Sequence, residues 1–305
     1  LSYRKLAMRV LGRPLHTGGV TITPSGLSAG SGVYPDCRDA HHPYRPRLAK
    51  EWYIEEGDIT VRAGETEGTN KVSQGENPEV EDTNTVITNS DKDKASSNTV
   101  TIEAERGDKV EVTLKDLNID ASRGSEAAVS VTGKGDTNIE LDAQALKSGD
   151  RHAGLEHNKT DTSGKLTIQD ENNDGSLNAT GGLRGAGIGG GEAQNGQVTI
   201  TGGDITATAG STAATYQTFG GGAGIGGGDG GAGKGGKGDV EITGGTITAT
   251  GVYGAGIGGG RSADGDVTIS GGTIKKAESL SPTNPGGAGI GGGYYGDGRV
   301  TITGD

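Results

Sequence analysis

The sequence has one cysteine, Cys37, only 3% aromatic residues, and no long apolar run. A single cysteine excludes a disulfide scaffold and a zinc site built from cysteines. No stretch approaches the roughly 18 apolar residues that predict a membrane-spanning helix, so no such span is expected. Collagen is excluded as well, because the glycines do not recur at every third position.

Acidic residues outnumber basic ones, with 40 Asp and Glu against 28 Lys and Arg and a formal net charge of −12. This balance argues against general nucleic-acid binding, which depends on neutralising phosphates. Hydrophobic residues make up only 30% of the chain. Glycine accounts for 62 of the 305 residues, well above its usual share of roughly 7%. This composition predicts disorder unless the glycines follow a regular pattern.

The composition divides the chain into three regions. Residues 1–50 carry eight Lys and Arg against two Asp and hold five of the eight prolines. We interpret them as a basic head that is irregular or foreign to the main fold. Residues 51–180 are acidic and less regular. Residues 181–305 hold 44 of the 62 glycines, and this array is expected to be truncated within a repeat at its C-terminal end.

One seven-residue string, GAGIGGG, recurs through the glycine-rich array. Each copy is followed by a string of the type VTITGG and then, in the first three repeats, by one such as DITAT. The spacings between successive copies are 37, 32 and 33 residues. The four copies occupy residues 185–191, 222–228, 254–260 and 287–293.

These strings alternate apolar and polar residues with period two, which predicts strands with one buried face. Val, Ile and Thr favour strands, whereas each glycine would cost a helix about 1 kcal/mol relative to alanine. In the first regular repeat, the predicted buried residues are Ile188, Val198, Ile200, Ile205 and Ala207. The predicted outward residues are Thr199, Thr201, Thr206 and Thr208.

Three short strands in each tandem unit predict an all-β fold, a right-handed single-stranded parallel β-helix with about 30–35 residues per rung. One rung cannot bury its Ile and Val side chains alone, but stacked rungs share one narrow core. Backbone hydrogen bonds between rungs and a thin apolar column would then replace a bulky core. Another solenoid or sandwich-like β array, and disorder, are the alternatives.

The acidic middle region continues this pattern in a less regular form. Its alternating runs predict strands near residues 58–61, 84–88, 99–103, 109–114, 117–119, 128–131 and 138–141. Residues 65–80 are charged and lack alternation, so we interpret them as a surface insertion. Trp52 and Tyr53 begin the region and are expected to cover the edge of the first rung.

Three strings precede the GAGIGGG units: DKVEVTLKDLNID from Asp108, GKGDTNIELDAQALKSGDRHAGLEHN from Gly133, and GKLTIQDENNDGSLNATGG from Gly164. With these strings, about residues 51–305 resemble secreted or surface proteins of anaerobic, mainly Gram-positive bacteria, described as carbohydrate-binding-domain-containing β-helix proteins. The resemblance implies a pectate-lyase-like shape, usually without the catalytic residues, and a role in binding plant or host polysaccharide or in adhesion. It also implies an extracellular or cell-surface location and other domains of a longer surface protein, although no signal peptide is visible.

A polysaccharide lyase or glycoside hydrolase is the alternative function. A lyase needs a cation-braced acidic cluster and a base, and the basic residues of the array do not recur beside acidic pairs at matching positions. A glycoside hydrolase needs two carboxyl groups a few ångströms apart. Asp264 and Asp266 could imitate such a pair, but we interpret them, like Asp239 and Asp297, as turn residues. We therefore predict no catalytic residues.

Two groups of residues are candidate cation ligands. Asp170, Asn172 and Asp174 match the first, third and fifth positions of an EF-hand loop, so calcium is the one cofactor that the sequence suggests. The twelfth position should be Glu and is glycine, which excludes a true EF-hand. His152 and His157 could act as a base or as ligands, and we interpret them as solvent-exposed loop residues.

The aromatic side chains of the array are the candidates for carbohydrate binding, because sugar rings stack on aromatic faces. The predicted residues are Tyr216, Phe219, Tyr253, Tyr294 and Tyr295. The first three precede a GAGIGGG string and are expected on one corner of successive rungs, whereas the last two follow a string and are expected one corner further on. The alternative is that these rings only cover exposed glycine backbone.

The sequence thus predicts a non-catalytic extracellular module that binds polysaccharide or mediates surface attachment. An enzyme acting on polysaccharide is the first alternative, and a purely structural surface stalk is the second. The expected partner is a plant cell-wall or host glycan, and nucleic acid is not an expected partner.

Overall fold

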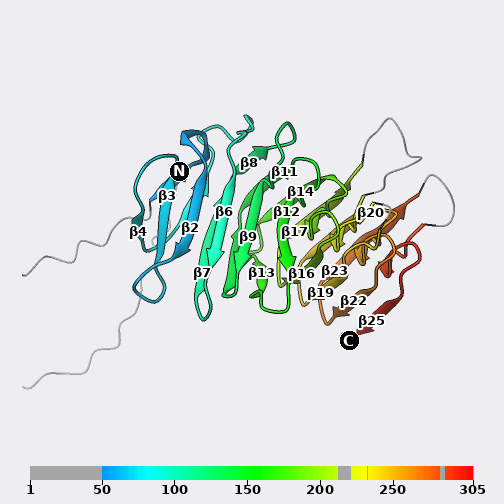
Figure 1. Ribbon diagram of the computed structural model, residues 1–305. Coiled ribbons are helices and arrows are strands. Elements are labelled where there is room, and N and C mark those ends of the chain that lie inside the picture. The colour runs from blue at the N-terminus through cyan, green and yellow to red at the C-terminus, as the bar shows by residue number, and fades with distance from the viewer. Residues whose placement is uncertain (1–49, 212–220, 232, 282–285, 305) are drawn as a thin grey trace, which may run out of the picture. The chain divides into compact units, whose positions relative to one another are not determined.

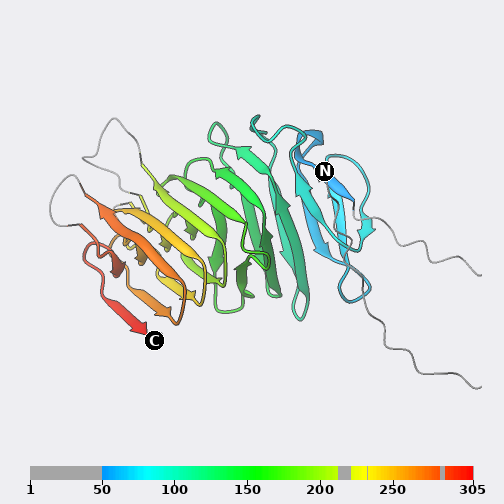
Figure 2. The ribbon, with the colours of Figure 1, turned by 180° about the vertical axis from the view of Figure 1, so that it is seen from behind.

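The computed structural model describes residues 50–211, 221–231, 233–281 and 286–304. The predicted basic head, except Lys50, lies outside the described residues. The regular structure of the described residues is strands and one short 3-10 helix, η1 (Ile54–Glu56). The strands form a parallel β-solenoid of about seven turns, whose rungs follow one another from β6 to β25 (Figures 1 and 2). The described residues contain no helix long and apolar enough to cross a membrane.

Each full rung places one strand on each of three faces, which we number in chain order. Face 1 contains β2 (Ile59–Ala63), β6 (Val100–Ala104), β9 (Val129–Gly133), β12 (Leu155–Lys159), β15 (Ile188–Gly189), β18 (Ile225–Gly226), β21 (Ile257–Gly258) and β24 (Ile290–Gly291). Face 2 contains β1 (Glu51–Tyr53), β5 (Val86–Thr88), β7 (Lys109–Lys115), β10 (Asp136–Leu141), β13 (Leu166–Gln169), β16 (Asn195–Ile200), β19 (Gly238–Ile242), β22 (Gly265–Ile269) and β25 (Gly298–Ile302). Face 3 contains β8 (Leu117–Asp120), β11 (Ala143–Lys147), β14 (Ser176–Leu183), β17 (Asp204–Gly210), β20 (Thr246–Val252) and β23 (Thr273–Leu280).

The repeats of the sequence stack in register. On face 2, Val198 lies opposite Val240, which lies opposite Val267 and then Val300 of β25. On face 1, the Ile of each GAGIGGG string lies opposite the Ile of the next string. Because the pairing is parallel and in register, residues at one position of the repeat form a column along the solenoid.

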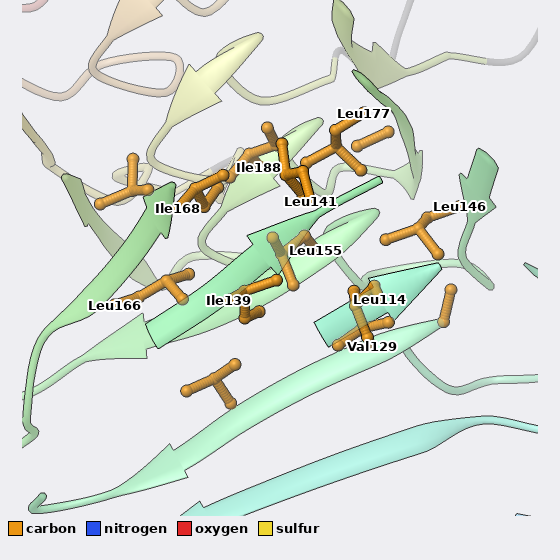
Figure 3. Close-up of a cluster of buried hydrophobic side chains, with 14 of the residues drawn as sticks. Leu114, Val129, Ile139, Leu141, Leu146, Leu155, Leu166, Ile168, Leu177 and Ile188 are labelled. Carbon is orange, nitrogen blue, oxygen red and sulfur yellow. The ribbon is translucent and has the colours of Figure 1, made fainter. Parts of the chain in front are cut away.

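The core is a single apolar column that runs through the stacked rungs. All five residues predicted to be buried in the first regular repeat are at most 1% exposed. Figure 3 shows side chains from the three faces meeting inside the rungs, among them Leu155 from face 1, Ile139 from face 2 and Leu146 from face 3. The predicted parallel β-helix and its alternation of buried and outward residues are therefore confirmed.

Glycine allows two backbones to come close where face 1 meets face 2. A Cβ atom added to Gly238 would lie 1.9 Å from the carbonyl oxygen of Gly258. Gly226 has a φ of 133°, a conformation that side-chain-bearing residues rarely adopt, and its added Cβ would lie 2.0 Å from that same oxygen. The glycine excess of the array therefore reflects close backbone packing and not disorder.

The first rung differs from the prediction. Residues 65–80 are not a simple insertion, because they contain β3 (Asn70–Gln74), which pairs antiparallel with β2. β4 (Val80–Asp82) then pairs antiparallel with β3. These two strands cover the N-terminal edge of face 1, while Trp52 is buried in the core and donates a 2.8 Å hydrogen bond from Nε1 to Asp82. The weak alternation of residues 70–74 was obscured by the charged loops around them.

Candidate functional site

A groove of about 440 Å³ lies where the last four strands of face 2 begin. In each of these rungs a glycine stands between two outward polar residues, and a valine follows. The sequences are Asn195-Gly-Gln-Val198, Lys237-Gly-Asp-Val240, Asp264-Gly-Asp-Val267 and Asp297-Gly-Arg-Val300. We call this surface the rung groove, and its polar side chains come from Lys159, Asn195, Lys237, Asp239, Asp264, Asp266, Asp297 and Arg299.

Ion pairs link successive rungs across the rung groove. Arg299 Nη2 lies 2.6 Å from Asp266 Oδ2, and Lys237 Nζ lies 3.7 Å from Asp264 Oδ2. Lys159, which comes from β12 of face 1, pairs with Asp239. The aspartate side chains of these pairs stay 46–50% exposed, so their oxygens can still accept hydrogen bonds from a ligand.

The turn interpretation of the aspartates is wrong for two of them. Asp239 and Asp266 are residues of β19 and β22, and they lie directly opposite each other in register. Asp264 and Asp297 precede their strands, and the backbone N–H of Asp297 donates a 3.0 Å hydrogen bond to Asp264 Oδ1. The repeated polar-Gly-polar-Val pattern could have predicted this groove, because alternation places the two polar residues on the same outward face.

Three of the predicted aromatic residues lie together at one corner. The ring centroids of Tyr253 and Tyr294 are 6.4 Å apart, and those of Tyr294 and Tyr295 are 3.9 Å apart. Tyr253 is buried against Ala209 and Val252, whereas Tyr295 is 82% exposed. Tyr295 therefore offers an open ring face, Tyr294 packs against Tyr295, and the buried Tyr253 supports Tyr294.

The prediction that Tyr294 lies one corner beyond Tyr253 is wrong. The backbone N–H of Tyr294 donates a 2.8 Å hydrogen bond to the carbonyl of Tyr253. The reason is that GAGIGGG forms only a two-residue strand, so face 1 is very narrow in the array. The residue before one copy, Tyr253, therefore lies close to the residue after the next copy, Tyr294. The other two predicted residues, Tyr216 and Phe219, lie outside the described residues.

The aromatic corner adjoins the rung groove. Tyr294 and Tyr295 line a hollow of about 450 Å³ together with Asp297 and Gly298. The same two residues, Asp297 and Gly298, also line the rung groove. An exposed ring and a ladder of charged and amide side chains are thus joined on one side of the solenoid.

A second groove, of about 360 Å³, lies on face 1 and is lined by polar side chains together with Ala127. Here His152 Nδ1 is 3.0 Å from Glu156 Oε2, and this hydrogen bond raises the pKa of His152 above its usual value. Glu156 is buried and also accepts hydrogen bonds from the Ala153 backbone N–H and from Asn158 Nδ2. Asp58, Glu126 and three side-chain hydroxyls complete the lining; the hydroxyls belong to Thr99, Thr101 and Ser130.

The interpretation of the two histidines as solvent-exposed loop residues is wrong for His157, which is buried on β12. It is wrong only in part for His152, which lies outside the strands but is about a third exposed. His157 is 2% exposed, with Nδ1 3.2 Å from the Val131 carbonyl and Nε2 3.0 Å from the Gly164 carbonyl. His152 is half-buried by its contact with Glu156. Both are held in place because Leu155–Lys159 forms β12, a strand of face 1 that the sequence pattern did not reveal.

The candidate calcium ligands lie in a tight turn between face 2 and face 3. Asp170 accepts 3.0 Å hydrogen bonds from the backbone N–H groups of Asn173 and Gly175, while Asn172 and Asp174 are exposed. Asp170 therefore stabilises the turn, and calcium binding stays a prediction. No group of three or more His, Cys, Asp and Glu side chains among the described residues is arranged to hold a metal ion.

Charged residues follow the GAGIGGG strings at the aromatic corner. Glu192 pairs with Arg151 and Arg184, and Arg261 Nε lies 3.4 Å from Asp229 Oδ1. Asp229 is fully buried, and burial raises its pKa to about 6. This network braces a corner whose glycines contribute no side chains.

The comparisons with known proteins agree with the fold. A beta helix repeat model matches residues 173–192, 240–261 and 267–294. The first segment begins just before β14 of face 3, and the other two begin within β19 and β22 of face 2. Each ends one residue after the next GAGIGGG string, so the matches follow the repeating rung. No curated protein and no solved structure matches the chain.

Proposed function

We propose that the chain is a non-catalytic, extracellular β-helix module of a bacterial surface or secreted protein, and that it binds polysaccharide or mediates adhesion. The observation that carries this proposal is the continuity of the rung groove with the exposed ring of Tyr295. A sugar residue combines hydroxyl groups with an apolar ring face. The groove supplies charged and amide hydrogen-bonding groups, and the tyrosine supplies a flat apolar surface with a polar hydroxyl.

Retention on insoluble glycans tests this proposal. The chain is applied to cellulose, pectin and mucin, with and without a chelator, and the bound fraction is measured. We expect retention on at least one glycan, and we expect Tyr295→Ala to reduce it. Tyr53→Ala, far from the groove in the first rung, is the matched control and should bind normally. Absence of retention on every glycan would contradict the proposal, and loss of retention with the chelator would support the predicted calcium site.

An enzyme is the second candidate, and the face-1 groove is the observation that favours it. Glu156 orients His152 in the way that a carboxylate orients a catalytic base, and Glu126 lines the same groove. Incubation with polygalacturonate and with neutral glycans tests this alternative. A rise in ultraviolet absorbance would support a lyase, and new reducing ends without that rise would support a hydrolase. Either activity should be lost in His152→Gln.

A further inference from the structure

The charges of the rung groove restrict the kind of glycan that it can accept. The groove carries four carboxylates, from Asp239, Asp264, Asp266 and Asp297, and three cations, from Lys159, Lys237 and Arg299. Each cation is already paired with a carboxylate inside the groove. A polyuronate or sulfated chain would meet a small excess of negative charge, because the carboxylates outnumber the cations and each cation is already partly neutralised by its partner. An uncharged sugar can donate to the carboxylates and accept from the cations without breaking these pairs.

The register of the strands indicates the direction in which a bound glycan chain would run. Asn195, Lys237, Asp264 and Asp297 occupy one position in four successive rungs, next to a parallel column that contains Asp239, Asp266 and Arg299. Neighbouring strands lie about 4.8 Å apart, which is close to the length of one sugar residue in an extended glycan. A glycan chain that runs along the solenoid axis would therefore meet one residue from each of these two columns at every sugar.

The residues at the two ends of the rung groove also favour a glycan that runs along the solenoid axis. Lys159, from β12, lies at the end where β16 begins, and Tyr295 lies beside Asp297 and Gly298 at the last rung. Tyr295 can stack on the sugar that occupies that rung. A glycan chain that ran along a single strand, perpendicular to the solenoid axis, would contact the polar residues of only one rung before it left the groove.

We infer that the rung groove binds an uncharged, extended glycan chain along the solenoid axis, with one sugar residue per rung. This inference rests on the proposed function and adds the charge class and the orientation of the ligand.

Calorimetric titration with short oligosaccharides tests the inference. The neutral probes are di-, tetra- and hexasaccharides of the cellulose, mannan and xylan series, and the anionic probe is hexagalacturonate. For at least one neutral series, affinity should rise about tenfold or more from the disaccharide to the tetrasaccharide. Hexagalacturonate should bind more weakly than that neutral hexamer.

Three variants separate the groove from the rest of the surface. Asp239→Ala with Asp266→Ala should weaken the best neutral hexamer about tenfold or more. Asp239→Lys with Asp266→Lys should weaken it as well and should allow hexagalacturonate to bind. Asp204→Ala is the matched control, because Asp204 is an exposed, ion-paired aspartate on face 3, outside the groove. Melting temperatures identify any variant that fails to fold, in which case the single substitution at Asp239 replaces the pair.

The outcomes distinguish this inference from the proposed function. Preference for hexagalacturonate, a flat dependence on chain length, or unchanged affinity in folded groove variants would overturn the inference while glycan binding itself stands. Lack of binding to every oligosaccharide and every insoluble glycan would overturn both.

Discussion

The middle rungs and the glycine-rich rungs build the same solenoid with different interiors. One column of face 3 shows the change, since Ile119 lies opposite Leu146, which is followed by Ala179, Ala207 and Ala249 in successive rungs. Face 1 changes in the same direction, because β6, β9 and β12 have five residues whereas β15, β18 and β21 have two. The solenoid thus passes from rungs filled by large side chains to rungs in which backbones pack closely.

This difference teaches that a sparse apolar composition does not preclude order. In the middle region, bulky residues such as Leu114 and Leu155 fill the interior. In the array, faces 1 and 3 combine one buried Ile with a nearby alanine, as in Ile188 with Ala186 and Ile205 with Ala207, and glycine lets the faces approach. We therefore expect larger side chains to destabilise the array and smaller side chains to destabilise the middle region.

The largest effect is expected where a methyl group is added to the array. Gly226→Ala places a Cβ 2.0 Å from the Gly258 carbonyl oxygen on a residue whose φ is 133°, so strain and overpacking should cost about 4 kcal/mol or more. The free energy of unfolding in urea measures this loss. Gly107→Ala in the middle region is the control, because its added Cβ has no neighbour within 4 Å, and it should cost about 1–2 kcal/mol for its positive φ. Equal losses would contradict the comparison.

The next effect tests the bulky interior. Leu146→Ala gives a middle rung the residue that the array carries at the same column, and it should destabilise the protein by about 2–5 kcal/mol because a cavity remains. Ala207→Leu makes the reverse change and should also destabilise the protein, by about 1–3 kcal/mol, through overpacking. Urea unfolding measures both. A neutral outcome for either variant would show that the interior adjusts freely between the two kinds of rung.

A smaller effect is expected from the buried acid of the array corner. The folded-state pKa of Asp229 is raised by burial from 3.8 to about 6, so the folded chain holds a proton that the unfolded chain has released. Its contribution to stability should be present below about pH 4 and should be lost, by about 2–3 kcal/mol, as pH rises through 6. Asp229→Asn should remove this dependence. The difference in melting temperature between the two proteins, followed from pH 4 to 8, measures it, and parallel curves would contradict the assignment.

The smallest effect is expected at His152 in the middle region. Its hydrogen bond to Glu156 raises its folded-state pKa above the usual 6.5. The resulting stabilisation should be complete below pH 6.5 and lost as pH rises through the higher folded-state pKa. Because the side chain is about a third exposed, solvent screening makes this change smaller than that of Asp229. His152→Gln should flatten the melting temperature between pH 6 and 9; a slope equal to that of the unaltered chain would contradict the prediction.

Much of the fold could be predicted because the repeat encodes it locally. Val198, Ile200, Ile205 and Ala207 were identified as buried from alternation alone, and seven runs in the middle region were identified as strands. No strand is predicted at β1, β3, β4, β11 or β12, and β3 and β12 lack a clear apolar–polar alternation. Asn70 and Gln74 are buried polar residues of β3, and Glu156 and His157 are buried polar residues of β12.

The candidate site was predicted only in part. The aromatic residues of the array were chosen from their composition and position, and Tyr253, Tyr294 and Tyr295 do meet. The rung groove was missed because its aspartates, next to glycines, were interpreted as turns. The place of Asp239 and Asp266 on strands, and the contribution of Lys159 from another rung, depend on which segments pair.

The sequence by itself determined the repeating rung, its alternation and the need for close backbone packing. These properties depend on neighbours along the chain and on a period that can be counted. The tertiary structure alone decided that Tyr253 supports Tyr294, that β12 buries Glu156 and His157, and that charged residues from four rungs share one groove. The physical reason is that stacking brings together residues about 30 positions apart, and the register of that stacking is set by the whole core.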